Sequence, residues 1–249
     1  MTGRLAHLFR YPVKSAGGEA LDHVSLTVGQ RLPGDRKWAV LTEAGATHTE
    51  KAGPGGWLPK ACFLRGAASG KLQAVIGGWQ GDKLHLRHPD LPDLIASPHD
   101  EGARIVDWLR PLWPADKPAP LRLEQAMTGF ADDKNPVISI LSLNSLRDLE
   151  ARLGQPLGLH RWRANLWIEG FAPQSERNWI GHDLHIGKAR LRVVEPIGRC
   201  TATGVDTTTG NPDIDMLAAL KDQFGHTDFG IFAEVITSAE IALNDEVRP

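Results

Sequence analysis

The residue of this sequence whose type and setting best suit chemistry is Cys200, which directly follows Arg199. An adjacent guanidinium favours the thiolate, and a thiolate attacks electrophiles or binds soft metal ions when the sulfur is reachable. A lone cysteine is also commonly a small, buried apolar residue. The residues around Cys200 therefore indicate either a reactive or metal-binding thiol or a core residue, and they leave both interpretations open.

Basic residues at expected loops and strand ends form a second candidate group, namely Lys14, Arg36, Arg163 and Arg199. Brought together, such side chains would bind a phosphate or another oxyanion through charge-assisted hydrogen bonds. Each one alone is typical of a solvated side chain, and their spacing does not bring them together.

Other common catalytic patterns are missing from the sequence. It has no G-x-S-x-G elbow, no phosphate-binding loop ending in Gly-Lys-Ser/Thr, and no G-x-G-x-x-G. His85 and His88, like His182 and His185, lie three residues apart on expected strands, where such residues face opposite sides, so the pairs do not indicate zinc.

Composition limits the class of protein. The 249 residues are 41% hydrophobic and carry a formal net charge of -2, so we expect a folded chain with no nucleic-acid partner. No apolar run is long enough for a transmembrane segment, and residues 1–7 do not start a signal peptide. Cys62 and Cys200 form no C-x-x-C pair, so we expect a cytoplasmic, reduced protein, with Cys62 in the core.

Short apolar runs separated by Gly and Pro predict a β-rich fold in which a strand delivers Cys200 to a loop. Strands are expected at residues 5–9, 21–28, 36–41, 62–64, 72–76, 83–87, 121–124, 137–141, 166–168, 184–187, 191–194, 229–236 and 246–247. Helices are expected at 101–109, capped by Asp100, at a segment ending before Gly154, and at 216–224. Residues 43–49 suggest a hairpin connection, and 53–56 and 132–136 suggest loops. The proline-rich stretch 113–120 predicts a boundary between domains 1–120 and 121–249.

Several motifs, in order along nearly the whole chain, together resemble a known family. They are Tyr11-Pro12-Val13-Lys14-Ser15, Gly34-Asp35-Arg36-Lys37-Trp38, Arg161-Trp162-Arg163-Ala164-Asn165-Leu166, Gly198-Arg199-Cys200, Val205-Asp206 and Phe232-Ala233-Glu234-Val235. The pattern is similar to MOSC proteins preceded by the MOSC N-terminal β-barrel domain, in the branch that includes the amidoxime-reducing components and is related to molybdenum cofactor sulfurase.

The resemblance implies an α/β fold that is β-rich, of the α+β type: an N-terminal β-barrel-like domain packed on a MOSC β-barrel with peripheral helices. It also implies a molybdenum cofactor (molybdopterin) in the cleft between them, with Cys200 as catalytic residue and metal ligand. The positions that match residues holding the pterin and its phosphate are Lys14, Ser15, Arg36, Arg163, Asn165 and Arg199. Asp206 matches a catalytic position close to the metal.

By the same resemblance we expect an oxidoreductase that reduces N-hydroxylated or other N- or S-oxygenated small molecules. The sequence ends at Pro249 without an iron-sulfur domain, so we expect the electrons to come from a separate electron-donor protein. Gly198, Ala164 and the Thr203-Gly204 pair depart from the family pattern, which bears on substrate preference. Two alternatives stay open: a sulfur carrier or sulfurtransferase with a persulfide on Cys200, and a non-catalytic protein that binds or delivers the cofactor.

Overall fold

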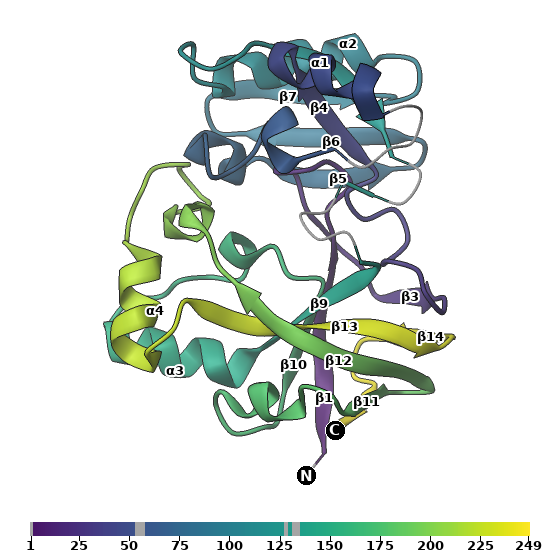
Figure 1. The fold of residues 1–249 in the computed structure, drawn as a ribbon, viewed down its shortest axis with the longest axis vertical. Coiled ribbons are helices and arrows are strands. Elements are labelled where there is room, and N and C mark those ends of the chain that lie inside the picture. Colours follow the sequence, from purple (N-terminus) through teal and green to yellow (C-terminus); the bar gives the residue numbers. More distant parts are fainter. Residues whose placement is uncertain (1, 53–57, 127–128, 131–134) are drawn as a thin grey trace.

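The computed structural model describes residues 2–52, 58–126, 129–130 and 135–249, which form two stacked units (Figure 1). We call them the barrel and the N-terminal unit. The loop expected at 53–56 lies outside the described residues, as do residues 132–134 of the loop expected at 132–136. Within the described residues, no helix is long and apolar enough to cross a bilayer.

The barrel is a closed sheet to which the described residues contribute seven strands. Around the sheet these are β1 (Gly3–Arg10), β10 (Leu166–Glu169), β9 (Val137–Ser142), β13 (Asp228–Thr237), β12 (Ala189–Gly198), β11 (Asp183–Ile186) and β15 (Glu246–Arg248). The first strand closes the ring because it pairs antiparallel with both β10 and β15. Alternate side chains such as Leu5, Ile168 and Val193 are fully buried inside the ring, the pattern that a period of two produces.

The N-terminal unit combines two small sheets with two helices. Strand β4 (Trp38–Thr42) pairs with β8 (Pro120–Gln125), and β5 (Ile76–Gln80), β6 (Lys83–His88) and β7 (Leu91–Ala96) form an antiparallel sheet. Helix α2 (Gly102–Leu109) covers β7 and β8, while α1 (Glu43–Ala52) follows β4. Val40, Leu64, Leu84 and Ile105 lie in the shared core of this unit.

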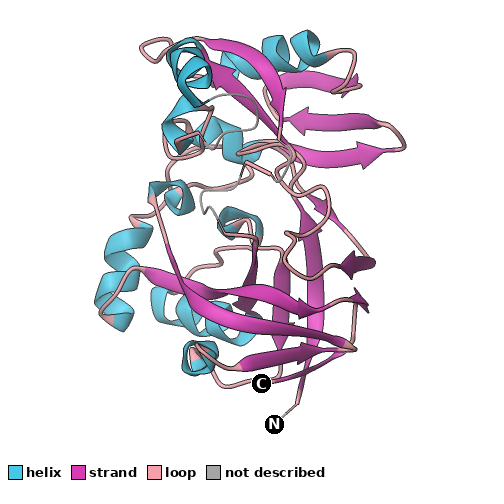
Figure 2. Ribbon diagram, turned by 45° about the vertical axis from the view of Figure 1, so that its right-hand side comes forward, coloured by secondary structure: helices cyan, strands magenta, loops and turns pink. Residues whose placement is uncertain are grey.

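Two helices lie outside the barrel, on the side shown at the left of Figure 2. Helix α3 (Leu143–Leu153) begins at Ser142, whose hydroxyl accepts a hydrogen bond from the Ser145 amide, and ends at Gly154 in the left-handed conformation. Helix α4 (Met216–Phe224) begins at Asp215, whose carboxylate accepts from the Ala218 amide, and ends in the same way at Gly225. Both helices were predicted, and the β-rich fold class with a barrel and peripheral helices is confirmed.

The boundary between domains at residue 120 stays a prediction. The chain passes between the units more than once, since β1 belongs to the barrel and β8 pairs with β4 of the N-terminal unit. Three short strands lie beside the barrel: β2 (Glu19–Ala20) pairs with β1, and β3 (His23–Leu26) pairs with β14 (Ala239–Ala242).

Some expected elements differ from those observed. The hairpin connection expected at 43–49 is wrong, because these residues form helix α1, whose start is held where Thr42 Oγ1 accepts a hydrogen bond from Gly45 N at 3.1 Å. The strand expected at 72–76 is instead a 3₁₀ turn, Gly70–Ala74, with three consecutive buried residues, which a half-buried strand does not have. The helix at α2 is confirmed, but Asp100 accepts a hydrogen bond from the Ser97 hydroxyl rather than capping it.

Candidate functional site

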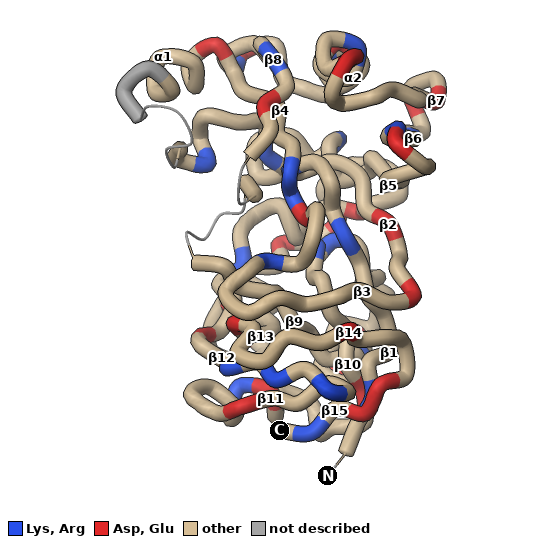
Figure 3. The backbone as a smooth tube through the Cα atoms, turned by 90° about the vertical axis from the view of Figure 1, so that its right-hand side faces the viewer, with Lys and Arg blue, Asp and Glu red and all other residues tan. Residues whose placement is uncertain are grey.

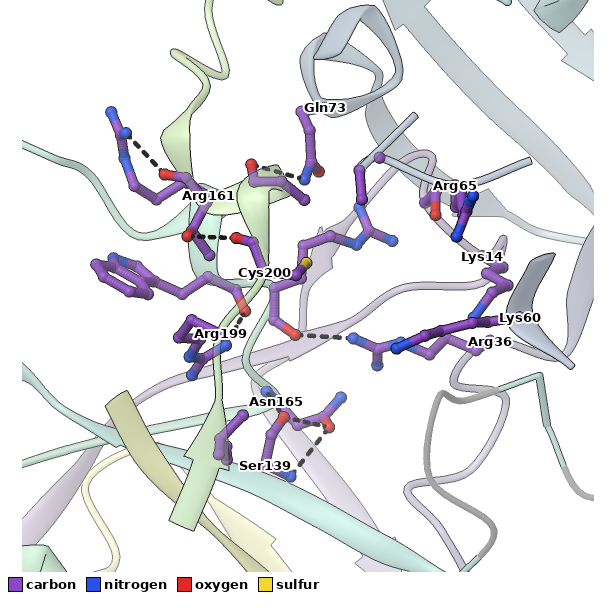
Figure 4. A pocket seen from close by; sticks show the side chains of 18 of the residues that line it. Lys14, Arg36, Lys60, Arg65, Gln73, Ser139, Arg161, Asn165, Arg199 and Cys200 are labelled. Atoms are coloured by element: carbon purple, nitrogen blue, oxygen red, sulfur yellow. Dashed lines mark hydrogen bonds between the residues drawn. The ribbon is translucent and has the colours of Figure 1, made fainter. Parts of the chain in front are cut away.

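A cavity of about 350 Å³ lies between the barrel and the N-terminal unit. All seven residues predicted to hold a cofactor or metal line it: Lys14, Ser15, Arg36, Arg163, Asn165, Arg199 and Cys200. Figure 4 shows Cys200, Arg161 and Arg199 on one side, and Lys14, Arg36, Lys60 and Arg65 on the other. Residues almost two hundred positions apart in the sequence therefore share one site.

The backbone around Cys200 is held while its side chain is exposed. Strand β12 ends at Gly198, and the Arg199 amide donates to the Thr227 carbonyl at 3.0 Å. Thr203 then donates twice to the Cys200 carbonyl, from its amide at 3.1 Å and from its hydroxyl at 2.9 Å. The structure thus excludes the core-residue interpretation of Cys200. Cys62 is the buried cysteine, and burial raises the pKa of its thiol.

Arg161 anchors the turn that follows Cys200. Its guanidinium donates to the Thr203 carbonyl at 3.1 Å and to the Leu157 carbonyl at 2.5 Å, and it forms a bidentate ion pair with Asp213 at 3.0 and 2.6 Å. The side chain of Arg161 is only 3% exposed. Sequence reasoning placed Arg161 in a family motif but gave it no role in the site, because its partner Asp213 is distant in the sequence.

Arg199 places a buried positive charge beside Cys200. Its guanidinium donates to the carbonyl of Phe229 and, at 3.0 Å, to the carbonyl of Trp162, whose ring lies 5.3 Å from the guanidinium carbon. Burial lowers the pKa of Arg199 to about 9, a shift that the neighbouring Cys200 opposes, so the side chain remains charged at neutral pH. The hydrogen bonds found for Arg199 thus go to the protein backbone.

Arg36 and Arg163 both lie over the ring of Tyr11. Their guanidinium carbons lie 5.2 and 4.3 Å from the ring centre, within the range of cation–π contacts. The Tyr11 hydroxyl donates to the Ala164 carbonyl at 3.3 Å, and burial raises the pKa of Tyr11 to about 12, so the phenol stays neutral. Asp35 accepts from the Tyr11 amide at 2.9 Å and pairs with Arg36.

The same two arginines connect the two units. Arg163, which comes from the barrel, donates to the carbonyls of Gly17 at 2.8 Å and Val13 at 3.2 Å. Arg36 donates to the Arg163 carbonyl at 2.9 Å. Ser15, Arg36 and Arg163 have φ values of 65°, 50° and 48°, which non-glycine residues rarely adopt. Only Gln174 and Asn244 share this feature among the non-glycine residues that the structure describes. Such backbone strain clusters at functional sites.

Two further predicted residues, Asn165 and Lys14, are buried and hydrogen-bonded to the protein. Asn165 is buried; its side-chain oxygen accepts from the Ser139 hydroxyl at 2.9 Å, and its amide donates to the Phe9 carbonyl at 3.3 Å. Lys14 is also buried and donates to the Phe130 carbonyl at 2.9 Å. Both residues therefore shape the cavity as well as line it.

The charge of the lining is strongly positive. Of the described residues, eight basic side chains line the cavity, against the single carboxylate of Asp35. Figure 3 shows Lys and Arg positions along the backbone where the two units meet. A chain with a formal net charge of -2 therefore presents a local positive field inside the cavity, which suits an anionic ligand.

Asp206 does not line the cavity. Its carboxylate accepts from the Thr208 amide at 2.8 Å and from the Thr209 hydroxyl at 3.1 Å, so it stabilises the turn in which it lies. The backbone hydrogen bond from Thr208, together with the threonine hydroxyls, lowers the pKa of Asp206.

Sequence reasoning missed several polar lining residues, among them Arg31, Lys60, Arg65, Gln73 and Arg161. Gln73 comes from the N-terminal unit, and its side-chain amide donates to the Ala202 carbonyl at 3.2 Å. None of these five stands next to Cys200 in the sequence, and only Arg161 lies in a family motif.

The order of domains identifies the family. Residues 2–102 match the MOSC N-terminal beta barrel domain, and residues 128–248 match the MOSC domain. The chain therefore belongs to the MOSC family, which confirms the resemblance inferred from the motifs.

Individual relatives are distant in sequence but similar over most of the chain. The chain is 26% identical to mitochondrial amidoxime reducing component 2 of Bos taurus, over 84% of this chain and 68% of that protein. It is 25% identical to mitochondrial amidoxime-reducing component 1 of Xenopus laevis, over 84% of this chain and 67% of that protein. Molybdenum cofactor sulfurase of Anopheles gambiae is 24% identical over 92% of this chain, which spans 34% of that protein.

Among solved structures, the YUAD protein of Bacillus subtilis aligns with 99% of this chain and 94% of its own, at 14% identity and a TM-score of 0.47.

Proposed function

We propose that this protein binds a molybdenum cofactor and reduces N-hydroxylated or other N- or S-oxygenated small molecules. The observation that carries the proposal is the exposed Cys200 thiol at a strongly basic cavity between the two units. The named relatives that are amidoxime-reducing components support the choice of substrate class.

The residues present fit such a cofactor. Molybdopterin is an anion with a phosphate group, and the cavity offers basic side chains from both units. A single exposed thiol suits a soft transition metal. Cys200 would be the metal ligand, and the other positions proposed to hold the pterin are Lys14, Ser15, Arg36, Arg163, Asn165 and Arg199. When bound, the molybdenum would supply the two-electron redox chemistry.

In the proposed reaction the N–O bond of an amidoxime breaks. Two electrons and two protons are consumed, the oxygen leaves as water, and the amidine forms. We propose that a separate electron-donor protein provides the electrons. The chain itself would hold the cofactor, position the oxygenated nitrogen beside Cys200, and neutralise the negative charge of the pterin with Lys14, Arg36, Arg163 and Arg199. Asp206 enters this proposal only as the residue that shapes its own turn, and its catalytic role stays a prediction.

The experiment uses protein purified from a host that makes the cofactor. We expect close to one molybdenum atom per chain by elemental analysis, and reduction of benzamidoxime with reduced methyl viologen as electron source. Cys200→Ser should lose turnover, whereas Cys62→Ala, which changes a buried thiol outside the cavity, should keep both metal and activity. A Cys200→Ser protein with undiminished metal content and turnover would exclude the proposal.

The second candidate, a sulfur carrier, is favoured by the exposure of Cys200 and by the relatives named molybdenum cofactor sulfurase. Here a cysteine desulfurase would transfer its persulfide sulfur to the Cys200 thiolate, and the desulfurase cysteine would leave as a thiol. Mass spectrometry would then show a cyanide-sensitive gain of one sulfur atom on Cys200. A protein that binds the cofactor without any turnover would instead be a storage or delivery protein. The cytoplasmic location and the absence of a nucleic-acid partner stay predictions.

A further inference from the structure

Two of the basic side chains that line the cavity differ from the rest in their surroundings. The guanidinium or ammonium groups of five of them contact protein acceptors, as described for Lys14, Arg36, Arg161, Arg163 and Arg199. A sixth, Arg31, also has an interaction partner. Lys60 and Arg65 also line the cavity, but within the described part of the chain neither side chain has a hydrogen bond or ion pair. They are therefore available to an anion that enters the cavity.

The backbone that carries Lys60 and Arg65 is well fixed. The three residues from Cys62 to Leu64 between them are buried. Leu64 N donates to the Val40 carbonyl of β4 at 2.9 Å, and the Cys62 carbonyl accepts from the Thr42 hydroxyl at 3.0 Å. After this segment, the Arg65 carbonyl accepts hydrogen bonds from two amides of the next turn, at 3.0 and 3.2 Å. The two charges thus extend from a rigid segment, which lowers the entropy that binding costs.

This segment is also held against the loop that carries Cys200. Gly66, the neighbour of Arg65, is so close to that loop that an added Cβ would lie 3.4 Å from the Ala202 side chain and 2.7 Å from the Gln73 amide nitrogen. Gln73 in turn donates to the Ala202 carbonyl at 3.2 Å. Figure 4 shows Lys60 and Arg65 on the side of the cavity opposite Arg199, with Cys200 between. A molecule whose reacting end lies at Cys200 can therefore extend its other end toward Lys60 and Arg65.

We propose that Lys60 and Arg65 form a subsite for a carboxylate of the substrate, so that the preferred substrates are N-oxygenated compounds that also carry a negative charge. This inference rests on the proposed function. A guanidinium binds a carboxylate through two parallel hydrogen bonds, and a neighbouring ammonium adds a point charge. Because Lys60 is exposed and Arg65 is half-buried, the effect is moderate and depends on salt.

The test compares two substrates that share one reacting group, benzamidoxime and 4-carboxybenzamidoxime, on the cofactor-loaded full chain. The wild type should prefer the carboxylated compound. In Arg65→Gln and Lys60→Gln, kcat/KM for that compound should fall about tenfold, mainly through KM, which corresponds to loss of one charge-assisted contact. The kcat/KM for benzamidoxime and the molybdenum content should not change. Lys188→Gln, which removes an exposed charge outside the cavity, should leave both substrates unaffected.

Binding of a non-reducible pair, benzamide and 4-carboxybenzamide, gives a readout that does not need turnover. Calorimetry should show that the wild type binds the carboxylated compound more tightly, and this preference should be lost in the Arg65→Gln variant. If neither amidoxime is reduced by the wild type, the proposed function fails while this measurement still tests the subsite. The inference would be overturned if the variants lost activity equally on both substrates or lost molybdenum, and either result would assign these charges to the cofactor. It would also be overturned if neither assay showed a preference for the carboxylated compound.

Discussion

Replacing Arg161 tests whether a buried ion pair holds the turn after Cys200. In Arg161→Met the long apolar stem is kept, but the carbonyls of Thr203 and Leu157 and the carboxylate of Asp213 lose their donor. Breaking a fully buried pair costs about 3–5 kcal/mol. Because the Asp213 side chain is 30% exposed and water can reach it, we expect about 2–4 kcal/mol.

For a chain of this size, such a loss lowers Tm by roughly 4–16 °C. The measurement is urea unfolding of the wild type and of Arg161→Met, with Asp213→Leu and the double variant to complete a double-mutant cycle. The double variant should be more stable than the sum of the single losses predicts, because it leaves no unpaired charge. The turn should also loosen, so that a disulfide reagent modifies Cys200 faster.

The matched control is Arg152→Met, which removes one partner of an exposed pair with Asp148 on helix α3. That pair should contribute only about 0.5 kcal/mol or less. If Arg161→Met costs no more than this control, or if the cycle shows no coupling with Asp213, then the ion pair does not hold the turn.

Three further predictions follow from burial and close contact. Burial raises the pKa of Glu176 above its usual 4.5, so its stabilising contribution is full below pH 4.5 and is lost as pH rises through the folded-state pKa. In unfolding measurements against pH, the stability of Glu176→Gln relative to the wild type should therefore increase as pH rises through this range. A stability difference that does not change with pH would contradict this. A disulfide reagent should modify one thiol of the folded protein, Cys200, and reach Cys62 only after unfolding; equal rates would contradict the burial assigned to Cys62. Gly45→Ala should destabilise the protein by about 1–3 kcal/mol in urea, because the new Cβ would lie 2.3 Å from the Cys62 carbonyl oxygen, whereas Gly102→Ala meets only an ordinary contact and should be neutral or stabilising.

The sequence predicted those parts of the fold that depend on local patterns. Helices α3 and α4 follow from their apolar spacing and from glycines at their ends, and β12 follows from the apolar run before Cys200. Helix α1 was missed because its residues are polar, small or glycine and carry little apolar periodicity; contacts with β4 and the segment around Cys62 place it there. Tertiary contact, which a local pattern does not contain, decided that element.

The same distinction holds for the site. Residues within the family motifs, such as Lys14, Arg163 and Cys200, were named from the sequence and do meet in one cavity. Lys60 and Arg65 were not named, since their neighbours carry no motif and their position depends on how the segment around Phe63 pairs with β4. A set of side chains drawn from both units is a property of the assembled fold.

The arginines of the cavity have a structural role, because their hydrogen bonds connect the two units. Arg163 donates to carbonyls of the loop after β1, Arg36 donates to the Arg163 carbonyl, and both guanidinium groups contact the Tyr11 ring. Each arginine therefore joins the two units while its charge remains at the cavity. An anionic ligand would neutralise these neighbouring positive charges and so stabilise the junction, because binding to the folded state alone always adds to stability. The same side chains therefore support both ligand binding and the contact between the two units.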